Sequence, residues 1–178
     1  DILVTTDVGQ HQMFAAQYYP VNEPRTFLTS GSLGTMGFGL PAAIGASLQN
    51  PQKRVICISG DGSILMNVQE LATLAENNLA VTVIIFVNHT LGMVYQQQKF
   101  LFDKNYSAST FSAQPDFLQI AKGFGIEGTN ANTDSEWFKK AFDQNRKNKP
   151  YIVTVKVDPE ENVLPFVPGG KANIDSIR

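Results

Sequence analysis

The sequence predicts an α/β domain with a doubly wound, mainly parallel sheet and helices on both faces of that sheet. Short β-rich runs alternate with helical patterns along the chain, which is typical of βαβ units. Two of these runs, Val55–Ile58 and Val81–Val87, are apolar almost throughout, so both of their faces must be covered. A chain of 178 residues that is 43% hydrophobic is large enough for one domain with its own core.

Six runs rich in β-branched and aromatic residues are the predicted strands. The run at 126–129 is the weakest of them. The strands are expected at Ile2–Thr5, Thr26–Thr29, Arg54–Ser59, Val81–Asn88, Ile126–Thr129 and Tyr151–Val157.

The clearest helix is predicted at Ile64–Asn78, between the two most apolar strands. Its apolar residues recur at a spacing of three and four, so they share one face. The paired asparagines at its end supply a stop signal. The residues on this face are Val68, Leu71, Ala72 and Ala75.

Three further helices are predicted from local signals. One spans Gln12–Gln17, and another runs from Pro115, a residue suited to a first turn, to Lys122 before a glycine at 123 or 125. Thr133 and Glu136 have the spacing of a capping box, which predicts a third helix through residue 145. Its apolar face is expected to contain Trp137, Phe138, Ala141 and Phe142.

Composition excludes several classes of function. The chain has 14 basic and 16 acidic residues, so it offers no positive stripe for a nucleic acid. Its apolar runs are much shorter than the ~20 residues of a membrane span, and no export signal is visible. Cys57, the single cysteine, lies in an apolar run and is expected to be a small buried hydrophobe. We therefore expect a reducing, cytoplasmic location without nucleic acid or membrane as partner.

The turn Gly60-Asp61-Gly62-Ser63 lies at the end of a predicted strand and opens a helix. Glycines there let the backbone approach a ligand, and the amides at a helix N-terminus can receive a phosphate. Asp61 would repel that phosphate unless a divalent cation lay between them, so the same turn predicts Mg²⁺. The alternative is a tight strand-to-helix turn with Asp61 as a helix cap.

Asn88 ends the next strand of the same βαβ unit. The carboxyl ends of adjacent parallel strands meet, so the Asn88 amide oxygen is expected beside the Asp61 carboxylate. Two hard oxygen ligands would then converge, which suits Mg²⁺ shared with phosphate oxygens. Otherwise, Asn88 would simply be a turn former.

The turn at 60–63 followed by Asn88 resembles the signature of thiamine-diphosphate enzymes, in which the Asp and a later Asn hold the metal on the diphosphate. The family has a second Asn where this chain has Val87, but the metal ligand of the family is the later one. Four other segments resemble the C-terminal domain of the biosynthetic acetolactate synthase catalytic subunit. They are VGQHQM at 8–13, TSGSLGTMG at 29–37, MNVQELAT at 66–73 and LGMV at 91–94.

The resemblance assigns roles to individual residues. Gln10 and His11 would meet the diphosphate oxygens, unless they are only the polar start of a helix. The Gly34 carbonyl would accept a hydrogen bond from the aminopyrimidine, and Met36 would separate the two cofactor rings, unless it is core filler. Thr90 would give the metal a backbone carbonyl. The implied cofactor-binding set is Gln10, His11, Gly34, Met36, Gly60, Asp61, Gly62, Ser63, Asn88, Gly92 and Met93, and the implied metal set is Asp61, Asn88 and Thr90.

The resemblance also implies what this chain lacks. We expect residues 1–170 to form the diphosphate-binding domain and residues 171–178 to form a C-terminal tail. The N-terminal pyrimidine-binding domain and the middle domain, which carries FAD in the family, are expected outside this chain. No catalytic residue is expected here, because the activating Glu of the family belongs to the N-terminal domain of a second subunit.

The implied function is that of acetolactate synthase, which decarboxylates pyruvate and condenses the hydroxyethyl unit with a second 2-keto acid in branched-chain amino-acid biosynthesis. The implied assembly is a homodimer or homotetramer, and a regulatory small subunit is compatible with it. One alternative is another thiamine-diphosphate enzyme such as glyoxylate carboligase. A non-catalytic module that binds a nucleotide or a phosphate is the other.

Overall fold

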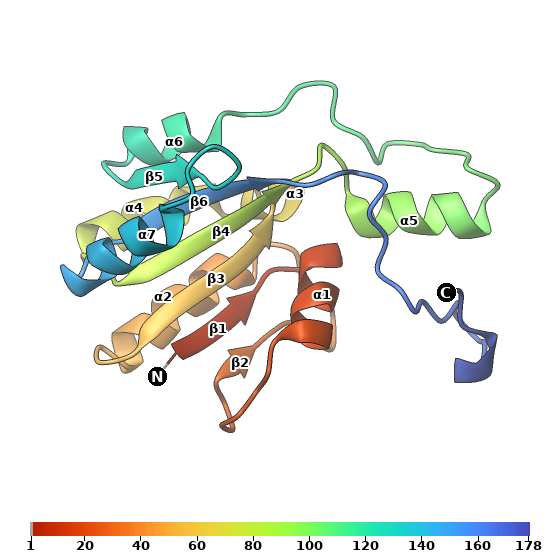
Figure 1. Ribbon diagram of the computed structural model, residues 1–178, viewed down its shortest axis with the longest axis horizontal. Helices are drawn as coiled ribbons and strands as arrows, with labels where there is room; N and C mark the ends of the chain where they lie inside the picture. Colours follow the sequence, from red (N-terminus) through yellow and green to blue (C-terminus); the bar gives the residue numbers. More distant parts are fainter. Residues whose placement is uncertain (1) are drawn as a thin grey trace.

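A single parallel sheet of six strands organises the computed structural model, which describes residues 2–178 (Figure 1). The strand order is β2-β1-β3-β4-β6-β5, and every neighbouring pair is parallel. The predicted fold class is therefore confirmed. The strands are β1 (Ile2–Thr6), β2 (Phe27–Leu28), β3 (Arg54–Gly60), β4 (Val81–Val87), β5 (Glu127–Asn130) and β6 (Tyr151–Lys156).

Helices cover both faces of the sheet. The larger core cluster packs α2, α4 and α6 on one face, and a smaller cluster packs α7 on the other, where α1 also contacts β3. Helix α5 lies beyond the carboxyl ends of the strands (Figure 1). The helices are α1 (Gln10–Tyr18), α2 (Gly39–Gln49), α3 (Asp61–Ile64), α4 (Leu71–Glu76), α5 (Gly92–Leu101), α6 (Phe117–Gly123) and α7 (Trp137–Arg146), with 3₁₀ turns at Val68–Glu70 and Asn173–Asp175.

The winding of the chain reverses between β1 and β3. Strand β1 pairs with β2 on one side and with β3 on the other. Helix α1 connects β1 to β2, and α2 then leads back across β1 to β3. In an open parallel sheet, such a reversal separates the connections that leave the strand ends and creates a crevice for a ligand.

The central strands of the sheet carry the apolar core. Val55, Val81, Val83 and Ile152 have no exposed surface. Cys57 is likewise fully buried in β3, as predicted, and burial raises the pKa of its thiol to about 12. The high pKa keeps this thiol protonated at neutral pH.

The predicted helix at 64–78 is wrong as a continuous element. The structure divides this stretch into α3, a 3₁₀ turn and α4. The interruption lies at Asn67, whose side-chain amide donates to the Gly37 carbonyl oxygen at 2.7 Å. This tertiary contact overrides the helical pattern, and it also shifts the buried face of α4, because Ala72 is exposed whereas Leu74 is fully buried.

The capping box predicted for α7 is also wrong. Thr133 donates its hydroxyl to the Asn130 carbonyl, and the helix starts only at Trp137. Asp134 instead accepts from the Glu136 amide at 3.0 Å, because its short carboxylate reaches the backbone two residues on. Within the predicted apolar face, Phe138 is 63% exposed.

Helix α6 begins after Asp116 rather than at Pro115. The Asp116 carboxylate accepts from the amides of Leu118 and Gln119, both at 3.0 Å, and so caps the helix. The helix ends at Gly123, one of the two predicted stops. Helices α2 and α5 were not predicted as elements, because their glycines and glutamines weaken the periodic signal.

Residues 171–178 fold back onto the preceding segment. The backbone amides of Phe166 and Ile177 each donate to the carbonyl of the other, at 2.9 and 2.8 Å. Across residues 2–178, none of the helices combines the length and the apolar character needed to cross a membrane.

Two glycines of α2 provide a matched test of its packing. A Cβ at Gly39 would lie 2.6 Å from the Asp7 amide nitrogen, which is backbone and cannot rotate away, whereas a Cβ at Gly45 meets no atom within 4 Å. We expect Gly39→Ala to lower the free energy of unfolding by about 1–3 kcal/mol. Gly45→Ala should raise it by about 0.5–1 kcal/mol, because alanine loses less backbone entropy on folding. Urea denaturation measures both values, and a stabilising Gly39→Ala would contradict the close approach of α2 to β1.

Candidate functional site

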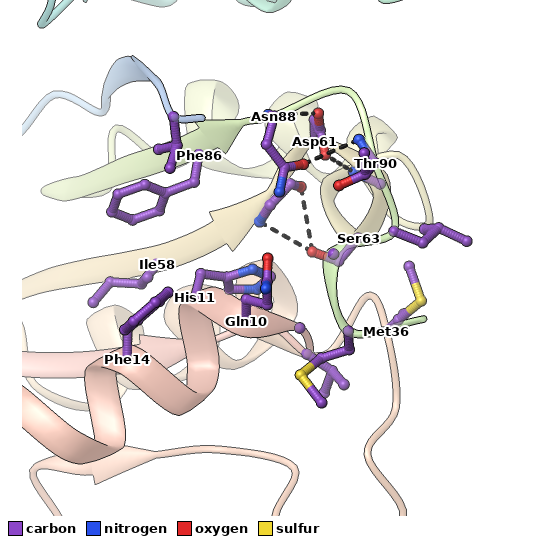
Figure 2. Close-up of a pocket in the computed structure, with 18 of the residues that line it drawn as sticks. Gln10, His11, Phe14, Met36, Ile58, Asp61, Ser63, Phe86, Asn88 and Thr90 are labelled. Atoms are coloured by element: carbon purple, nitrogen blue, oxygen red, sulfur yellow. Dashed lines mark hydrogen bonds between the residues drawn. The ribbon is translucent and has the colours of Figure 1, made fainter. Parts of the chain in front are cut away.

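A cavity of about 490 Å³ opens at the carboxyl ends of β1, β3 and β4, at the point where the winding reverses. Its polar end gathers around Asp61, Asn88 and Thr90, and Phe14, Ile58 and Phe86 line another part of its wall (Figure 2). The structure brings all of the predicted site residues to this one cavity. They are Gln10, His11, Gly34, Met36, Gly60, Asp61, Gly62, Ser63, Asn88, Thr90, Gly92 and Met93.

The strand register explains why two of the predicted metal ligands, Asp61 and Asn88, meet. Gly60, the last residue of β3, pairs with Phe86 of β4, so Asp61 and Asn88 follow at the same edge of the sheet. The Ser63 hydroxyl accepts from the Gly60 amide at 3.1 Å and closes the turn. The fold therefore places Asp61 next to the loop that leaves β4.

The Asp61 carboxylate organises both turns at the polar end of the cavity. Its Oδ1 accepts from the Gly62 amide at 2.9 Å, and its Oδ2 accepts from the amides of Asn88 and His89 at 3.1 and 2.8 Å. Burial raises the pKa of Asp61, and these backbone hydrogen bonds act in the opposite direction. The alternative interpretation of this turn made Asp61 a helix cap, but the N-cap residue of α3 is Gly60.

Asn88 and Thr90 add further oxygen atoms beside Asp61. The Asn88 Oδ1 accepts from the Thr90 amide at 3.0 Å, and a carboxamide oxygen keeps a second lone pair for another partner. The Thr90 hydroxyl oxygen is buried and has no hydrogen-bond partner within residues 2–178. The polar end thus carries uncommitted oxygen capacity.

This donor set suits one kind of metal ion. Within the described part of the chain, no group of three or more His, Cys, Asp and Glu side chains could hold a metal. One carboxylate with neutral oxygens cannot form a complete cage. Mg²⁺ commonly binds through one or two protein oxygens plus waters and phosphate oxygens, so these residues fit it when a diphosphate supplies the remaining ligands.

His11 lies at the start of α1 and presses its ring against the turn after β3. A Cβ at Gly60 would lie 2.8 Å from the ring, so a larger residue there would force the ring to move. The Nε2 atom of His11 is buried without a hydrogen-bond partner among residues 2–178. Burial lowers the pKa of His11 from 6.5 to about 4, so the ring is neutral at pH 7. An unpartnered ring nitrogen at this cavity fits a polar ligand.

Gln10 is committed within the protein. Its side-chain nitrogen donates to the Gln96 side-chain oxygen at 2.9 Å and to the Glu161 carbonyl at 3.0 Å. Both amide hydrogens are therefore in use. The remaining oxygen faces Gly92, where any Cβ would overlap it.

Met36 and Met93 line the cavity, and neither belongs to the core clusters. Met36 is only partly buried, which argues against the core-filler alternative. Gly34 has a φ of +63°, a left-handed conformation that glycine adopts without strain, and it is exposed. The backbone before Met36 is thus accessible from the cavity.

The family of the thiamine pyrophosphate enzyme, C-terminal TPP binding domain, matches residues 7–155. The chain belongs to this family. Its fold, a parallel sheet with helices on both faces, agrees with that membership.

Curated relatives of this TPP-binding domain are large subunits of acetolactate synthases. It is 49% identical to the acetolactate synthase isozyme 1 large subunit of Escherichia coli (strain K12), over 98% of this chain and 31% of that protein. It is 47% identical to the isozyme 2 large subunit of the same organism, over 99% of this chain and 32% of that protein. A probable acetolactate synthase large subunit of Methanococcus aeolicus is 42% identical over 99% of the chain and 30% of its own length. The chain thus spans about a third of these relatives.

Sequence reasoning missed several residues that shape the site of this TPP-binding domain. Asp7, at the end of β1, is fully buried and accepts from the Gly37 and Val8 amides at 2.7 and 2.9 Å. Burial raises the pKa of Asp7 against these hydrogen bonds. An acidic residue directly after an apolar strand was the available signal for Asp7. The apolar wall, and the contacts of Gln96 and Glu161, depend on tertiary packing and left no local signal.

The buried neutral His11 predicts a pH dependence of stability. Its pKa is about 4 in the folded chain and 6.5 ordinarily, so the unfolded chain binds a proton that the folded chain does not bind between these values. The free energy of unfolding should therefore fall by about 2–3 kcal/mol between pH 7.5 and 4.5 through this residue. His11→Gln should remove that part of the decrease. Urea denaturation at both pH values measures it, with exposed His89→Gln as the control, and an unchanged decrease in His11→Gln would refute the assignment.

Proposed function

We propose that the chain is the thiamine-diphosphate- and Mg²⁺-binding domain of an acetolactate synthase, an enzyme that decarboxylates pyruvate and joins the two-carbon unit to a second 2-keto acid in branched-chain amino-acid biosynthesis. The observation that carries this proposal is the cavity where the winding of the sheet reverses, which gathers every predicted site residue in a chain of the TPP-binding family. The named relatives are acetolactate synthase large subunits, which supports this enzyme over glyoxylate carboligase.

In this proposal, Asp61, the side-chain oxygen of Asn88 and the carbonyl of Thr90 hold Mg²⁺ on the diphosphate. The neutral His11 ring offers its unpartnered nitrogen to the same end. The Gly34 carbonyl orients the pyrimidine, and the side chains of Met36 and Met93 shape the apolar part of the site. Bound thiamine diphosphate would supply an electron sink for the decarboxylation of a 2-keto acid.

The proposed assembly pairs this domain with the N-terminal, pyrimidine-binding domain of a second subunit in a homodimer or homotetramer. Tyr18, which lines the cavity, is 74% exposed, and Leu33, next to Gly34, is 89% exposed. Apolar groups exposed around a cavity favour cover by another protein surface. The same proposal includes pyruvate and a second 2-keto acid as substrates. It also includes FAD in the middle domain, a regulatory small subunit and a cytoplasmic location.

Calorimetric titration tests the cofactor assignment. We expect thiamine diphosphate to bind the chain only with Mg²⁺ present, and ADP with Mg²⁺ to bind far more weakly. Equal binding of both compounds, or binding unaffected by a chelator, would favour the nucleotide- or phosphate-binding module instead.

Asp61→Asn tests the metal assignment. Asparagine keeps one acceptor oxygen, which can still serve the amides of Asn88 and His89, but its NH2 group leaves the Gly62 amide without an acceptor and the negative charge is removed. We expect the affinity for thiamine diphosphate with Mg²⁺ to fall by about tenfold or more, and the melting temperature to fall moderately because one buried amide loses its acceptor. Calorimetry and thermal melting measure the two effects, and wild-type affinity in Asp61→Asn would exclude the carboxylate as a metal ligand.

The chain alone should bind the cofactor weakly and turn over no substrate. Without a second protein wall, the cavity is open to water, which screens its charges, and the activating Glu is not provided. Incubation with Mg²⁺, thiamine diphosphate and pyruvate, followed by assays for CO₂ and acetolactate, checks this prediction. Turnover at ordinary enzyme rates would contradict it, whereas activity restored by adding the N-terminal domains of a related large subunit would support it.

A further inference from the structure

The segment after β6 passes beside α5 (Figure 1). Val157 and Glu161 of this segment line the cavity, and Val163 has no exposed surface. The segment contains no helix or strand of its own between residues 158 and 166. Side chains of neighbouring elements contact its backbone at Glu161 and Val163.

One fully buried side chain, Gln96 of α5, makes the internal contacts. Its Oε1 accepts from the Val163 amide at 2.7 Å and from the Gln10 side-chain nitrogen at 2.9 Å. Its Nε2 donates to the Val163 carbonyl at 3.1 Å. Gln96 thus pairs with the backbone of Val163 as a strand would, and it reaches α1 with the same carboxamide.

Gln10 completes the connection to the cavity. Its second amide hydrogen goes to the Glu161 carbonyl at 3.0 Å, two residues before Val163. Both hydrogens of Gln10 point toward α5 and the C-terminal segment, so its carboxamide has one fixed orientation at the cavity rim. Gln96, with its three hydrogen bonds, is costly to replace by an apolar group, because each of its buried partners would lose a hydrogen bond.

We infer that Gln96 is a positioning residue for the cofactor site: it fixes the carboxamide of Gln10 and docks the 158–163 segment as part of the cavity wall. This inference rests on the proposed function for the identity of the ligand. It assigns to Gln96 an effect on thiamine diphosphate affinity although Gln96 itself does not line the cavity.

A second contact holds the same segment from outside and provides a control. Glu160 accepts from the Tyr95 hydroxyl and from the Lys99 ammonium group, both at 2.7 Å. These groups lie at the surface, where such contacts contribute little. Tyr95→Phe should therefore leave cofactor affinity nearly unchanged.

Gln96→Met tests the inference, because methionine has a similar volume without the hydrogen-bonding groups. With thiamine diphosphate and Mg²⁺, we expect a dissociation constant about tenfold higher than in the wild type. Amide hydrogen exchange of the peptide containing Val163 should be at least about tenfold faster, since the Val163 amide loses its acceptor. Gln97→Met is the matched control, because Gln97 is the exposed neighbour on the same helix. Wild-type affinity in Gln96→Met would overturn the inference.

A double-variant comparison separates positioning from general damage to the fold. If Gln96 acts through Gln10, the affinity loss of the Gln10→Met, Gln96→Met pair should be clearly smaller than the product of the two single losses. Losses that multiply would overturn the positioning role. If the wild-type chain shows no Mg²⁺-dependent binding of thiamine diphosphate, the proposed function fails and the ligand part of the inference fails with it. The exchange experiment alone still decides whether Gln96 docks the segment.

Discussion

The carboxylate of Asp61 is the constraint on which the polar end of the cavity depends. It accepts amides from its own turn after β3 and from the turn after β4, and thereby ties together the ends of two adjacent strands. A carboxylate with three backbone donors holds the loops in place, and these hydrogen bonds counter the rise in its pKa that burial causes. One side chain therefore links the architecture of the sheet to the chemistry proposed for the cavity. Glycines flank Asp61 for a separate reason: a Cβ at Gly60 would lie 2.8 Å from the His11 ring, and a Cβ at Gly62 would lie 2.7 Å from the Leu91 side chain.

The sequence predicted the sheet and the location of the site because both depend on short-range patterns. Apolar runs such as 55–58 identify buried strands, and the residues that follow them must meet at the carboxyl edge of a parallel sheet. The residues at 60–63 and Asn88 were accessible to this reasoning.

Two of the failures have a common physical cause, which is competition from contacts that the sequence does not display. Asn67 breaks a periodic helix because its amide bonds to Gly37, thirty positions earlier. The start of α7 is a different case, because there the competing contact is local: Asp134 accepts from the Glu136 amide two residues on, and no side chain caps the helix. The partnership of Gln10 and Gln96 spans 86 positions, and the motif containing Gln10 gave no indication of it.

The buried thiol of Cys57 gives this domain an internal reporter of opening. Its pKa of about 12 and its lack of exposed surface make it inert while β3 remains in the sheet. An alkylating reagent can modify it only when β3 separates from its neighbours, which requires the core between both helical layers to come apart. Because it is the single cysteine in the chain, the rate of alkylation isolates that one event without any engineered label. The same strand ends in the turn that carries Asp61, so slower alkylation in the presence of a ligand would register how strongly that ligand clamps the sheet.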